Sequence, residues 1–314
     1  MRTRRLGATG LSVSRLGLGT MAWGGRTSAE DAEDLLGAFR DAGGTLVDTA
    51  HGYGGGAAEE LLGRFLAGRD REELVVVSKA GISRTAGERV VDCSRRALLH
   101  QLDTSLQRLG TDHLDVWLAH TWDPDTPLEE TVSALAHAWR TGRARYVGVS
   151  NHVGWQAART ASLLQAEGVP LAADSVELSL VERRPERELA DAAQALGFGL
   201  LPWSPLGRGV LTGRYRSGVP ADSRLASDEF SRFTGRHVGE HTRGVLESVR
   251  TAADGLGVSP AVVALAWVRD RPGVTAPVVG PRTPLQLDQL LAVEQVELPE
   301  QIVDALDEVS ADLA

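Results

Sequence analysis

The chain has 314 residues, of which 42% are hydrophobic and 24% charged, with a formal net charge of −9. This composition is typical of a protein with a sizeable core, and the acidic balance argues against a duplex nucleic-acid binder, which would need a basic face. The single cysteine, Cys93, rules out an intrachain disulfide, and no apolar run approaches the ~18 residues of a membrane span. We therefore expect a cytoplasmic protein without nucleic-acid or membrane partners.

In chain order, residues 3–16 predict a small hairpin with its turn at Gly7-Ala8-Thr9-Gly10. Eight short apolar runs, each followed by a helical pattern, then predict eight strands. The strands are expected at residues 16–20, 45–47, 74–78, 114–119, 146–149, 172–176, 198–201 and 274–279. The helices are expected at about residues 28–42, 57–67, 91–109, 126–142, 152–167, 185–196, 238–256, 260–267, 283–293 and 299–312.

Several helix starts have residues that favour capping. Thr27, with Glu30 three residues later, predicts a capping box at the start of the helix at 28–42. Thr126-Pro127 predicts the start of the helix at 126–142. Ser259-Pro260 and Thr283-Pro284 predict two further starts of the same kind.

Alternation of strands and helices implies a parallel sheet, and eight such units predict a (β/α)8 TIM barrel. A doubly wound sheet is the alternative. We expect a single barrel domain over residues 1–314, with an N-terminal hairpin and a long irregular loop at 205–237 after strand seven. Gly17-x-Gly19-x-x-Ala22 resembles a dinucleotide-binding fingerprint only superficially, because no helix pattern opens after it.

Ionisable side chains follow three consecutive strands of the predicted barrel. Asp48, Lys79 and His120 stand where strands two, three and four end, and Tyr53 lies on the loop after strand two. Each alone is more often a turn residue, a solvated lysine or a structural histidine. In a barrel all strand carboxyl ends meet on one face, where active sites lie. The coincidence of all four therefore favours a catalytic site.

These segments resemble the aldo-keto reductase family. The matching motifs cover the whole chain: Asp48-Thr-Ala-x-x-Tyr53-Gly with Glu60, Ser78-Lys79, Leu118-x-His120, Gly148-Val-Ser-Asn151, Ser204-Pro-Leu-Gly-Arg-Gly209 with Thr212-Gly213, and Gly280-Pro-Arg282. The resemblance implies an (α/β)8 barrel that reduces aldehydes or ketones with NAD(P)H and without a metal, and Arg282 favours NADPH as the cofactor.

Catalytic roles follow from the resemblance and are physically consistent. Tyr53 would give a proton to the developing alkoxide, although a free tyrosine has a pKa of about 10. Lys79 would lower that pKa, Asp48 would orient Lys79, and His120 would donate a hydrogen bond to the carbonyl oxygen.

Cofactor-binding residues are carried over in the same way. The resemblance assigns this role to Gly19, Thr20, Ser150, Asn151, Ser175, Trp203, Ser204, Pro205, Leu206, Gly207, Arg214, Gly280, Arg282, Gln286 and Gln289. Ser175 replaces the family's usual glutamine, and Leu290 replaces an asparagine that contacts adenine. Arg282 is the candidate partner of a 2′-phosphate.

The substrate is expected to be a small carbonyl compound that contacts Trp23, His51 and Trp122, while its identity and the oligomeric state are not encoded in any motif. Two other functions compete with this one. The chain could be a barrel that binds NADP and regulates a partner, or an aldolase that forms a Schiff base through Lys79.

Overall fold

The computed structural model describes residues 1–67, 71–85, 88–213, 235 and 237–313. Its main sheet has eight strands in the order β11-β10-β9-β8-β5-β4-β3-β12, and each neighbouring pair is parallel. The strands are β3 (Gly17–Gly19), β4 (Leu46–Asp48), β5 (Val75–Ala80), β8 (Leu114–Ala119), β9 (Ala144–Ser150), β10 (Leu171–Ser175), β11 (Gly199–Leu200) and β12 (Val278–Val279).

Parallel bridges join the two edges of this sheet, from Leu200 to Val274 and from Trp203 to Val278. The sheet therefore closes on itself. The expected (β/α)8 barrel is confirmed, and the doubly wound alternative does not apply.

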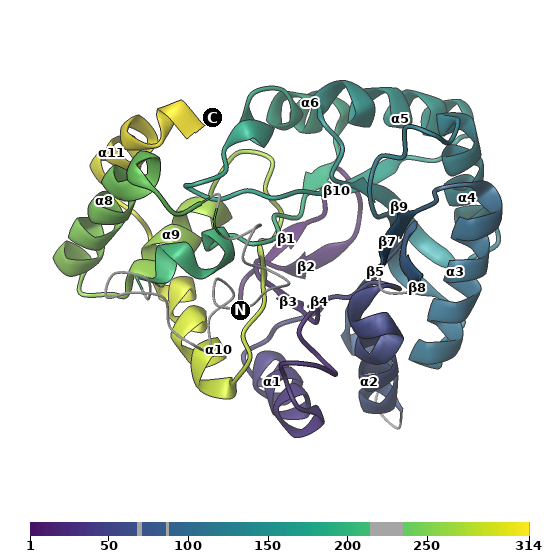
Figure 1. The fold of residues 1–314 in the computed structure, drawn as a ribbon, viewed down its shortest axis with the longest axis horizontal. Coiled ribbons are helices and arrows are strands. Elements are labelled where there is room, and N and C mark those ends of the chain that lie inside the picture. The colour runs from purple at the N-terminus through teal and green to yellow at the C-terminus, as the bar shows by residue number, and fades with distance from the viewer. Residues whose placement is uncertain (68–70, 86–87, 214–234, 236, 314) are drawn as a thin grey trace.

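Helices surround the strands (Figure 1). They are α1 (Ala29–Asp41), α2 (Ala57–Leu66), α3 (Arg95–Leu109), α4 (Leu128–Arg140), α5 (Gly154–Ala166), α6 (Leu189–Leu196), α8 (Glu240–Leu256), α9 (Pro260–Arg269), α10 (Pro284–Leu291) and α11 (Glu300–Val309). In α1 the buried residues Ala32, Leu35, Leu36 and Phe39 follow helical spacing, so one face of the helix packs on the core.

The N-terminal hairpin, β1 (Thr3–Arg5) with β2 (Ser12–Ser14), closes the amino end of the barrel. Leu6 and Val13 are fully buried in the core that fills the barrel. The Ser14 hydroxyl accepts hydrogen bonds from the backbone N–H groups of Thr45 and Leu46, at 3.0 and 3.1 Å, where β4 begins. The strand carboxyl ends therefore form the open face.

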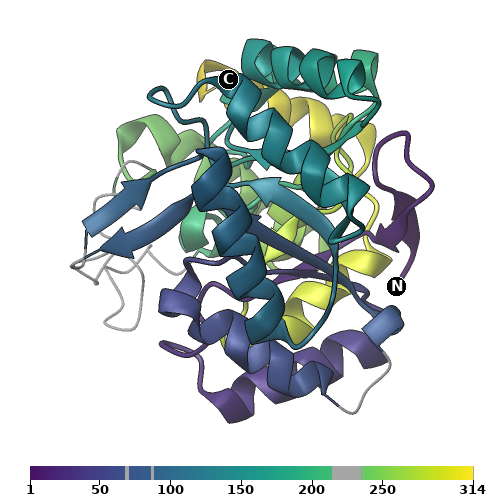
Figure 2. The ribbon, with the colours of Figure 1, turned by 90° about the vertical axis from the view of Figure 1, so that its right-hand side faces the viewer.

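A second hairpin, β6 (Ile82–Thr85) with β7 (Glu88–Val91), was not expected from the sequence. It projects from the barrel on the side away from the N-terminal hairpin (Figure 2). The helix predicted from residue 91 begins at Arg95 instead, because Ser94 caps it by accepting a hydrogen bond from the Ala97 N–H.

Two of the predicted helix caps are wrong. Ser28, not Thr27, accepts the hydrogen bond from the Asp31 N–H at the start of α1, while Thr27 is buried. The Thr126 hydroxyl donates to Asp123 at 2.8 Å, and α4 begins without a side-chain cap. Ser259 and Thr283 cap α9 and α10 as expected.

Strands seven and eight are shorter than predicted, with two residues each in β11 and β12. The predicted long loop starts with a 3₁₀ turn at Gly207–Thr212, and most of the rest of it lies outside the described residues. No single helix in the described ranges is long and apolar enough to cross a membrane; only Thr242–Leu256 and Pro260–Arg269 together, across a 101° bend, meet that test.

Candidate active site

The four side chains at the strand ends lie together at the open face of the barrel. The Lys79 ammonium donates to both carboxylate oxygens of Asp48, at 2.6 and 2.5 Å, and to the backbone carbonyl of Thr49 at 3.0 Å. The same Nζ atom lies 5.2 Å from the centre of the Tyr53 ring. The Tyr53 and His120 rings meet edge to face, with centroids 5.9 Å apart.

Lys79 is charged because of these neighbours. Only 2% of Lys79 and 4% of Asp48 is exposed. Burial alone would lower the pKa of the Lys79 ammonium, but the Asp48 carboxylate and a hydrogen bond with Tyr53 outweigh it, so the pKa is raised above its ordinary value. A buried cation is therefore held directly beside the tyrosine.

His120 is neutral at physiological pH. Burial, and then the charges of Lys79 and Arg89, hold its pKa well below the usual value of a histidine. Its backbone is fixed by a hydrogen bond from the His120 N–H to the Ala80 carbonyl at 2.8 Å. Its Nδ1 atom has no hydrogen-bond partner among the described residues. A neutral imidazole keeps one N–H group, so His120 can still donate a hydrogen bond.

A second network supports the strand ends from behind. Glu59 is fully buried and accepts hydrogen bonds from the Ser78 hydroxyl at 2.7 Å and from Arg108 at 3.1 Å. The sequence pointed to Glu60 in this motif, but Glu60 is exposed. Glu59 is thus the residue that anchors β5 next to Lys79.

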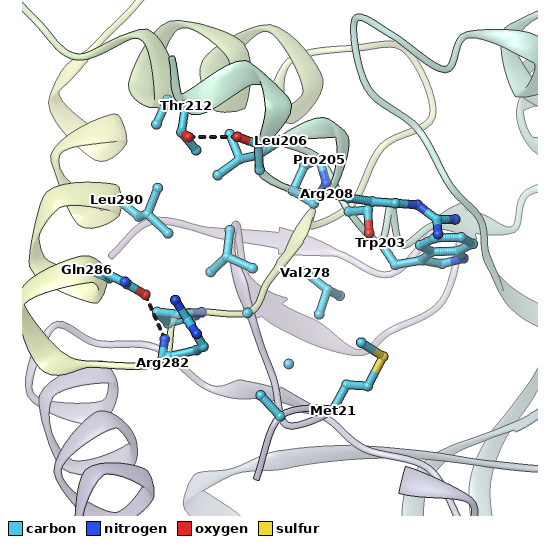
Figure 3. A pocket seen from close by; sticks show the side chains of 18 of the residues that line it. Met21, Trp203, Pro205, Leu206, Arg208, Thr212, Val278, Arg282, Gln286 and Leu290 are labelled. Atoms are coloured by element: carbon cyan, nitrogen blue, oxygen red, sulfur yellow. Dashed lines mark hydrogen bonds between the residues drawn. The ribbon is translucent and has the colours of Figure 1, made fainter. Parts of the chain in front are cut away.

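Beside these residues is a cavity of about 360 Å³ (Figure 3). Asp48 and Tyr53 form part of its wall. The residues carried over for cofactor binding that line it are Gly19, Trp203, Ser204, Pro205, Leu206, Gly280, Arg282, Gln286 and Gln289. The volume lies within the range of small-molecule and cofactor sites.

Two helices begin at this cavity. Ser259 and Ala261 at the start of α9, and Arg282 and Gln286 at the start of α10, belong to its lining. The Gln286 side chain accepts a hydrogen bond from the Arg282 backbone N–H at 2.9 Å (Figure 3). Helix N-termini offer unpaired N–H groups and a positive dipole end, so this part of the cavity suits phosphate groups.

A chain of hydrogen bonds links four of the residues carried over for cofactor binding: Ser150, Asn151, Ser175 and Trp203. The Asn151 side chain donates to the His120 carbonyl at 2.9 Å and to the Ser150 hydroxyl at 3.0 Å, and accepts from the Trp203 indole N–H at 3.1 Å. The Ser150 hydroxyl donates to the Ser175 carbonyl at 2.7 Å. Asn151 has a left-handed backbone, with φ of 59°.

Two buried hydroxyl groups in this part of the structure could bind a polar group of a ligand. Ser175 and Thr20 are buried, and their hydroxyl oxygens have no hydrogen-bond partner in the described part of the chain. A buried polar group without a partner is costly, so a ligand with amide groups would suit this region. Gly207 is buried just behind the lining, and Arg214 lies outside the described residues.

The three residues expected to contact substrate lie outside the cavity lining. Trp23 is 1% exposed and packs edge-on against Phe65, so its ring cannot touch a ligand. The His51 imidazole lies 3.4 Å from Arg108, and burial, together with the Arg108 charge, lowers its pKa to about 4. The sequence could not show this contact, because Arg108 is 57 residues away.

Trp122, the third of these residues, packs against His152 and Trp155, with ring centroids 5.4 and 5.2 Å away. It lies two residues after His120, but its ring borders a separate void of about 10 Å³. The expected contact of Trp122 with substrate therefore has no support in the shape of the main cavity.

Several residues of the cavity were missed in the sequence. Met21 and Arg208 line it, and Met21 is 40% exposed (Figure 3). Arg208 could have been suspected, because it is a charged residue between two glycines in the Ser204–Gly209 motif.

Known proteins resemble this chain over most of its length. The family model described as the Aldo/keto reductase family matches residues 15–311. L-glyceraldehyde 3-phosphate reductase of Escherichia coli (strain K12) is 34% identical over 92% of this chain and 86% of its own length. The uncharacterized oxidoreductase YrpG of Bacillus subtilis (strain 168) is 33% identical, covering 97% and 94%. A probable voltage-gated potassium channel subunit beta of Oryza sativa subsp. japonica is 34% identical, covering 98% and 96%.

Proposed function

The chain belongs to the aldo/keto reductase family, and from that membership we propose that it reduces an aldehyde or ketone to an alcohol with NADPH, with Tyr53 as the general acid. The observation that carries the proposal is the buried Lys79–Asp48 pair directly beside Tyr53 at the wall of the cavity. The bound nicotinamide would supply the hydride.

The protein supplies the proton and the stabilisation of charge. The Tyr53 hydroxyl gives its proton to the oxygen of the reacting carbonyl group as negative charge develops there. The Lys79 ammonium stabilises the phenolate that remains, and Asp48 keeps that ammonium charged and oriented. His120, as a neutral imidazole, donates a hydrogen bond to the same oxygen and fixes its position.

Two alternatives are less well supported. A Schiff-base aldolase needs a neutral lysine, whereas Asp48 holds Lys79 charged. The second alternative is a regulatory barrel that binds NADP without turnover. In its favour, one relative of this chain is named as a channel subunit. Such a regulatory function would not require Asp48, Tyr53, Lys79 and His120, all of which this chain retains, so the alternative is less well supported.

The test is multiple-turnover oxidation of NADPH in the presence of a panel of aldehydes and ketones. The panel includes glyceraldehyde 3-phosphate, because one relative is named for reducing its L form. We expect turnover with the wild type and a fall in kcat of at least ~100-fold for Tyr53→Phe, with binding of NADPH retained. Turnover by Tyr53→Phe close to that of the wild type would exclude the role of Tyr53.

The preference for NADPH over NADH rests on Arg282. Its place in the cavity wall at the start of α10 combines a helix N-terminus with a guanidinium group. A charge-assisted hydrogen bond is worth about 1.5–3 kcal/mol, which corresponds to about ten- to a hundredfold in affinity. Arg282→Ala should therefore raise the Kd for NADPH by that factor and leave the Kd for NADH almost unchanged. Equal weakening of both would show that Arg282 does not bind the 2′-phosphate.

A further inference from the structure

Glu177 lies two residues beyond the end of β10 and has no part in the roles described above. It is 8% exposed. Its backbone forms a parallel bridge with Trp203, and the Trp203 N–H donates to the Val176 carbonyl at 2.8 Å. Glu177 is therefore fixed beside Trp203, which the resemblance assigns to cofactor binding, but Glu177 does not itself line the cavity.

The Glu177 carboxylate binds Arg208 in a fork. Arg208 Nε donates to one oxygen at 2.7 Å and Nη2 to the other at 2.8 Å. The two side chains are 8% and 11% exposed. A two-point ion pair of this kind, shielded from water, fixes the orientation of the guanidinium plane as well as its position.

Arg208 in turn belongs to the loop that borders the cavity. Its φ is 58°, between Gly207 at 55° and Gly209 at 97°, so a residue with a side chain takes a backbone conformation that glycine adopts most easily. Such a conformation persists only where the surroundings hold it. The Glu177 carboxylate is one partner that holds this side chain.

Arg208 also fixes the Trp203 ring. Its guanidinium carbon lies 5.3 Å from the centre of the indole, a cation–π contact that Figure 3 shows at the edge of the cavity. The indole N–H is bonded to Asn151. The ring is thus fixed by Arg208 at its face and by Asn151 at its edge.

A cation site is an alternative explanation for the buried Glu177 carboxylate. Glu177, Glu182 and His237 have ligand atoms within 4.8 Å of one another, an arrangement that a cation could use. However, Arg208 forks Glu177, and Arg184 forks Glu182 with both contacts at 2.7 Å. Guanidinium groups therefore contact both carboxylates, and His237 Nε2 also lies 3.2 Å from the Glu177 carboxylate. We interpret this cluster as a support of the loop.

We propose that Glu177 is a positioning residue for the cofactor, which through Arg208 holds the Ser204–Gly209 loop and the Trp203 ring ready for binding. This inference rests on the proposed function. Without Glu177, binding would have to order the loop and the ring, and affinity falls by the cost of that ordering. The 2′-phosphate end is at α10, so NADP⁺ and NAD⁺ should be affected by the same factor.

The experiment measures the Kd of NADP⁺ and of NAD⁺ for Glu177→Gln, Arg208→Gln and the double variant, at a temperature where all are folded. We expect each single change to raise both Kd values by roughly tenfold, and the double variant to be no weaker than Arg208→Gln, because Glu177 acts through its contact with Arg208. Arg208→Lys should recover only part of the loss, since an ammonium cannot form the fork.

Glu182→Gln is the matched control. Glu182 is equally buried, at 6%, and equally forked by an arginine, but that arginine is Arg184. The Kd values of NADP⁺ and NAD⁺ for the Glu182→Gln variant should remain those of the wild type. A wild-type Kd in Glu177→Gln, or effects of the two single changes that multiply in the double variant, would overturn the inference. A wild-type chain that binds neither dinucleotide would overturn the proposed function and this inference with it.

Discussion

At the scale of single residues, the most unusual group outside the active site is the carboxyl group of Asp174. It is fully buried on β10, and neither oxygen has a hydrogen-bond partner among the described residues. Burial raises the pKa of this carboxyl well above its ordinary value, and the backbone of His152 only partly opposes the shift. A buried carboxylate is costly, so this group lowers stability wherever its proton must be lost.

The sign of the effect on stability follows from proton binding. Between the unfolded pKa, about 3.9, and the raised folded pKa, the folded state keeps a proton that the unfolded state has lost. Stability therefore falls as the pH rises through this window. Asp174→Asn removes the titration, so its stabilising effect should be small near pH 4 and should grow as the pH rises towards 8.

Thermal unfolding at several pH values measures this difference. Asp304→Asn is the control, because Asp304 is exposed on α11, and surface changes usually remain within about ±0.5 kcal/mol. A stabilisation by Asp174→Asn that did not grow with pH would contradict the prediction.

Individual residues also show where sequence reasoning ends. Asp48, Lys79 and His120 could be found because each follows an apolar strand, and a barrel brings strand ends together. The partnership of Glu177 with Arg208 joins residues 31 positions apart and could not be read from either motif. Trp23 is buried in the core rather than in the lining of the main cavity, because an aromatic residue next to a strand end can face the core as easily as the cavity.

At the scale of secondary-structure elements, the packing of α2 on α3 depends on Gly63. A Cβ atom there would lie 2.2 Å from the Arg108 carbonyl oxygen and 2.9 Å from the Leu109 Cα, both backbone atoms of α3. The two helices can approach this closely only because residue 63 has no side chain.

Gly63→Ala should therefore destabilise the protein by about 1–3 kcal/mol through overpacking. Gly37→Ala is the matched control, since Gly37 is also inside a helix and has no atom within 4 Å of the added Cβ. It should instead stabilise by about 0.5–1 kcal/mol, the usual gain of alanine over glycine in a helix. Chemical denaturation of both variants measures the change in the free energy of unfolding. If this change had the same sign in Gly63→Ala and Gly37→Ala, the packing argument would be refuted.

Element prediction succeeded where periodicity was strong and failed where it was short. The helix with Leu98, Leu102, Leu106 and Leu109 was evident from its spacing, but its start was placed four residues early. The hairpin β6–β7 was missed because its strands have four residues each and mix arginine and glutamate with apolar residues. Short polar strands carry little of the signal that sequence analysis uses.

At the scale of the whole molecule, the main cavity, where we propose that the cofactor binds, lies at the seam where the edges of the barrel sheet meet. Its lining includes residues that follow β3, β11 and β12. These are among the shortest strands, with two or three residues each, whereas β5, β8 and β9 have six or seven. A ligand that contacts all three loops would therefore bridge the weakest part of the barrel.

Binding of NADP⁺ should consequently stabilise the fold. At 100 times Kd the gain is about 2.7 kcal/mol, which is measurable as a rise in Tm. Hydrogen exchange should slow more in β3, β11 and β12 than in β5 and β8. A rise in Tm with equal slowing in all five strands would contradict the preference for the seam.

Pairing of β12 with β3 joins the end of the chain to its beginning, in register from Gly17 to Val278 and from Leu18 to Val279. During synthesis the N-terminal strands emerge first, so the outer edge of β3 has no partner until nearly the whole chain has been made. An exposed strand edge can pair with another molecule and start aggregation, and very short edge strands are one way in which proteins limit this risk. The three residues of β3 thus form only a short pairing with β12 in the finished barrel, but they also give the newly made chain little edge through which it could associate wrongly.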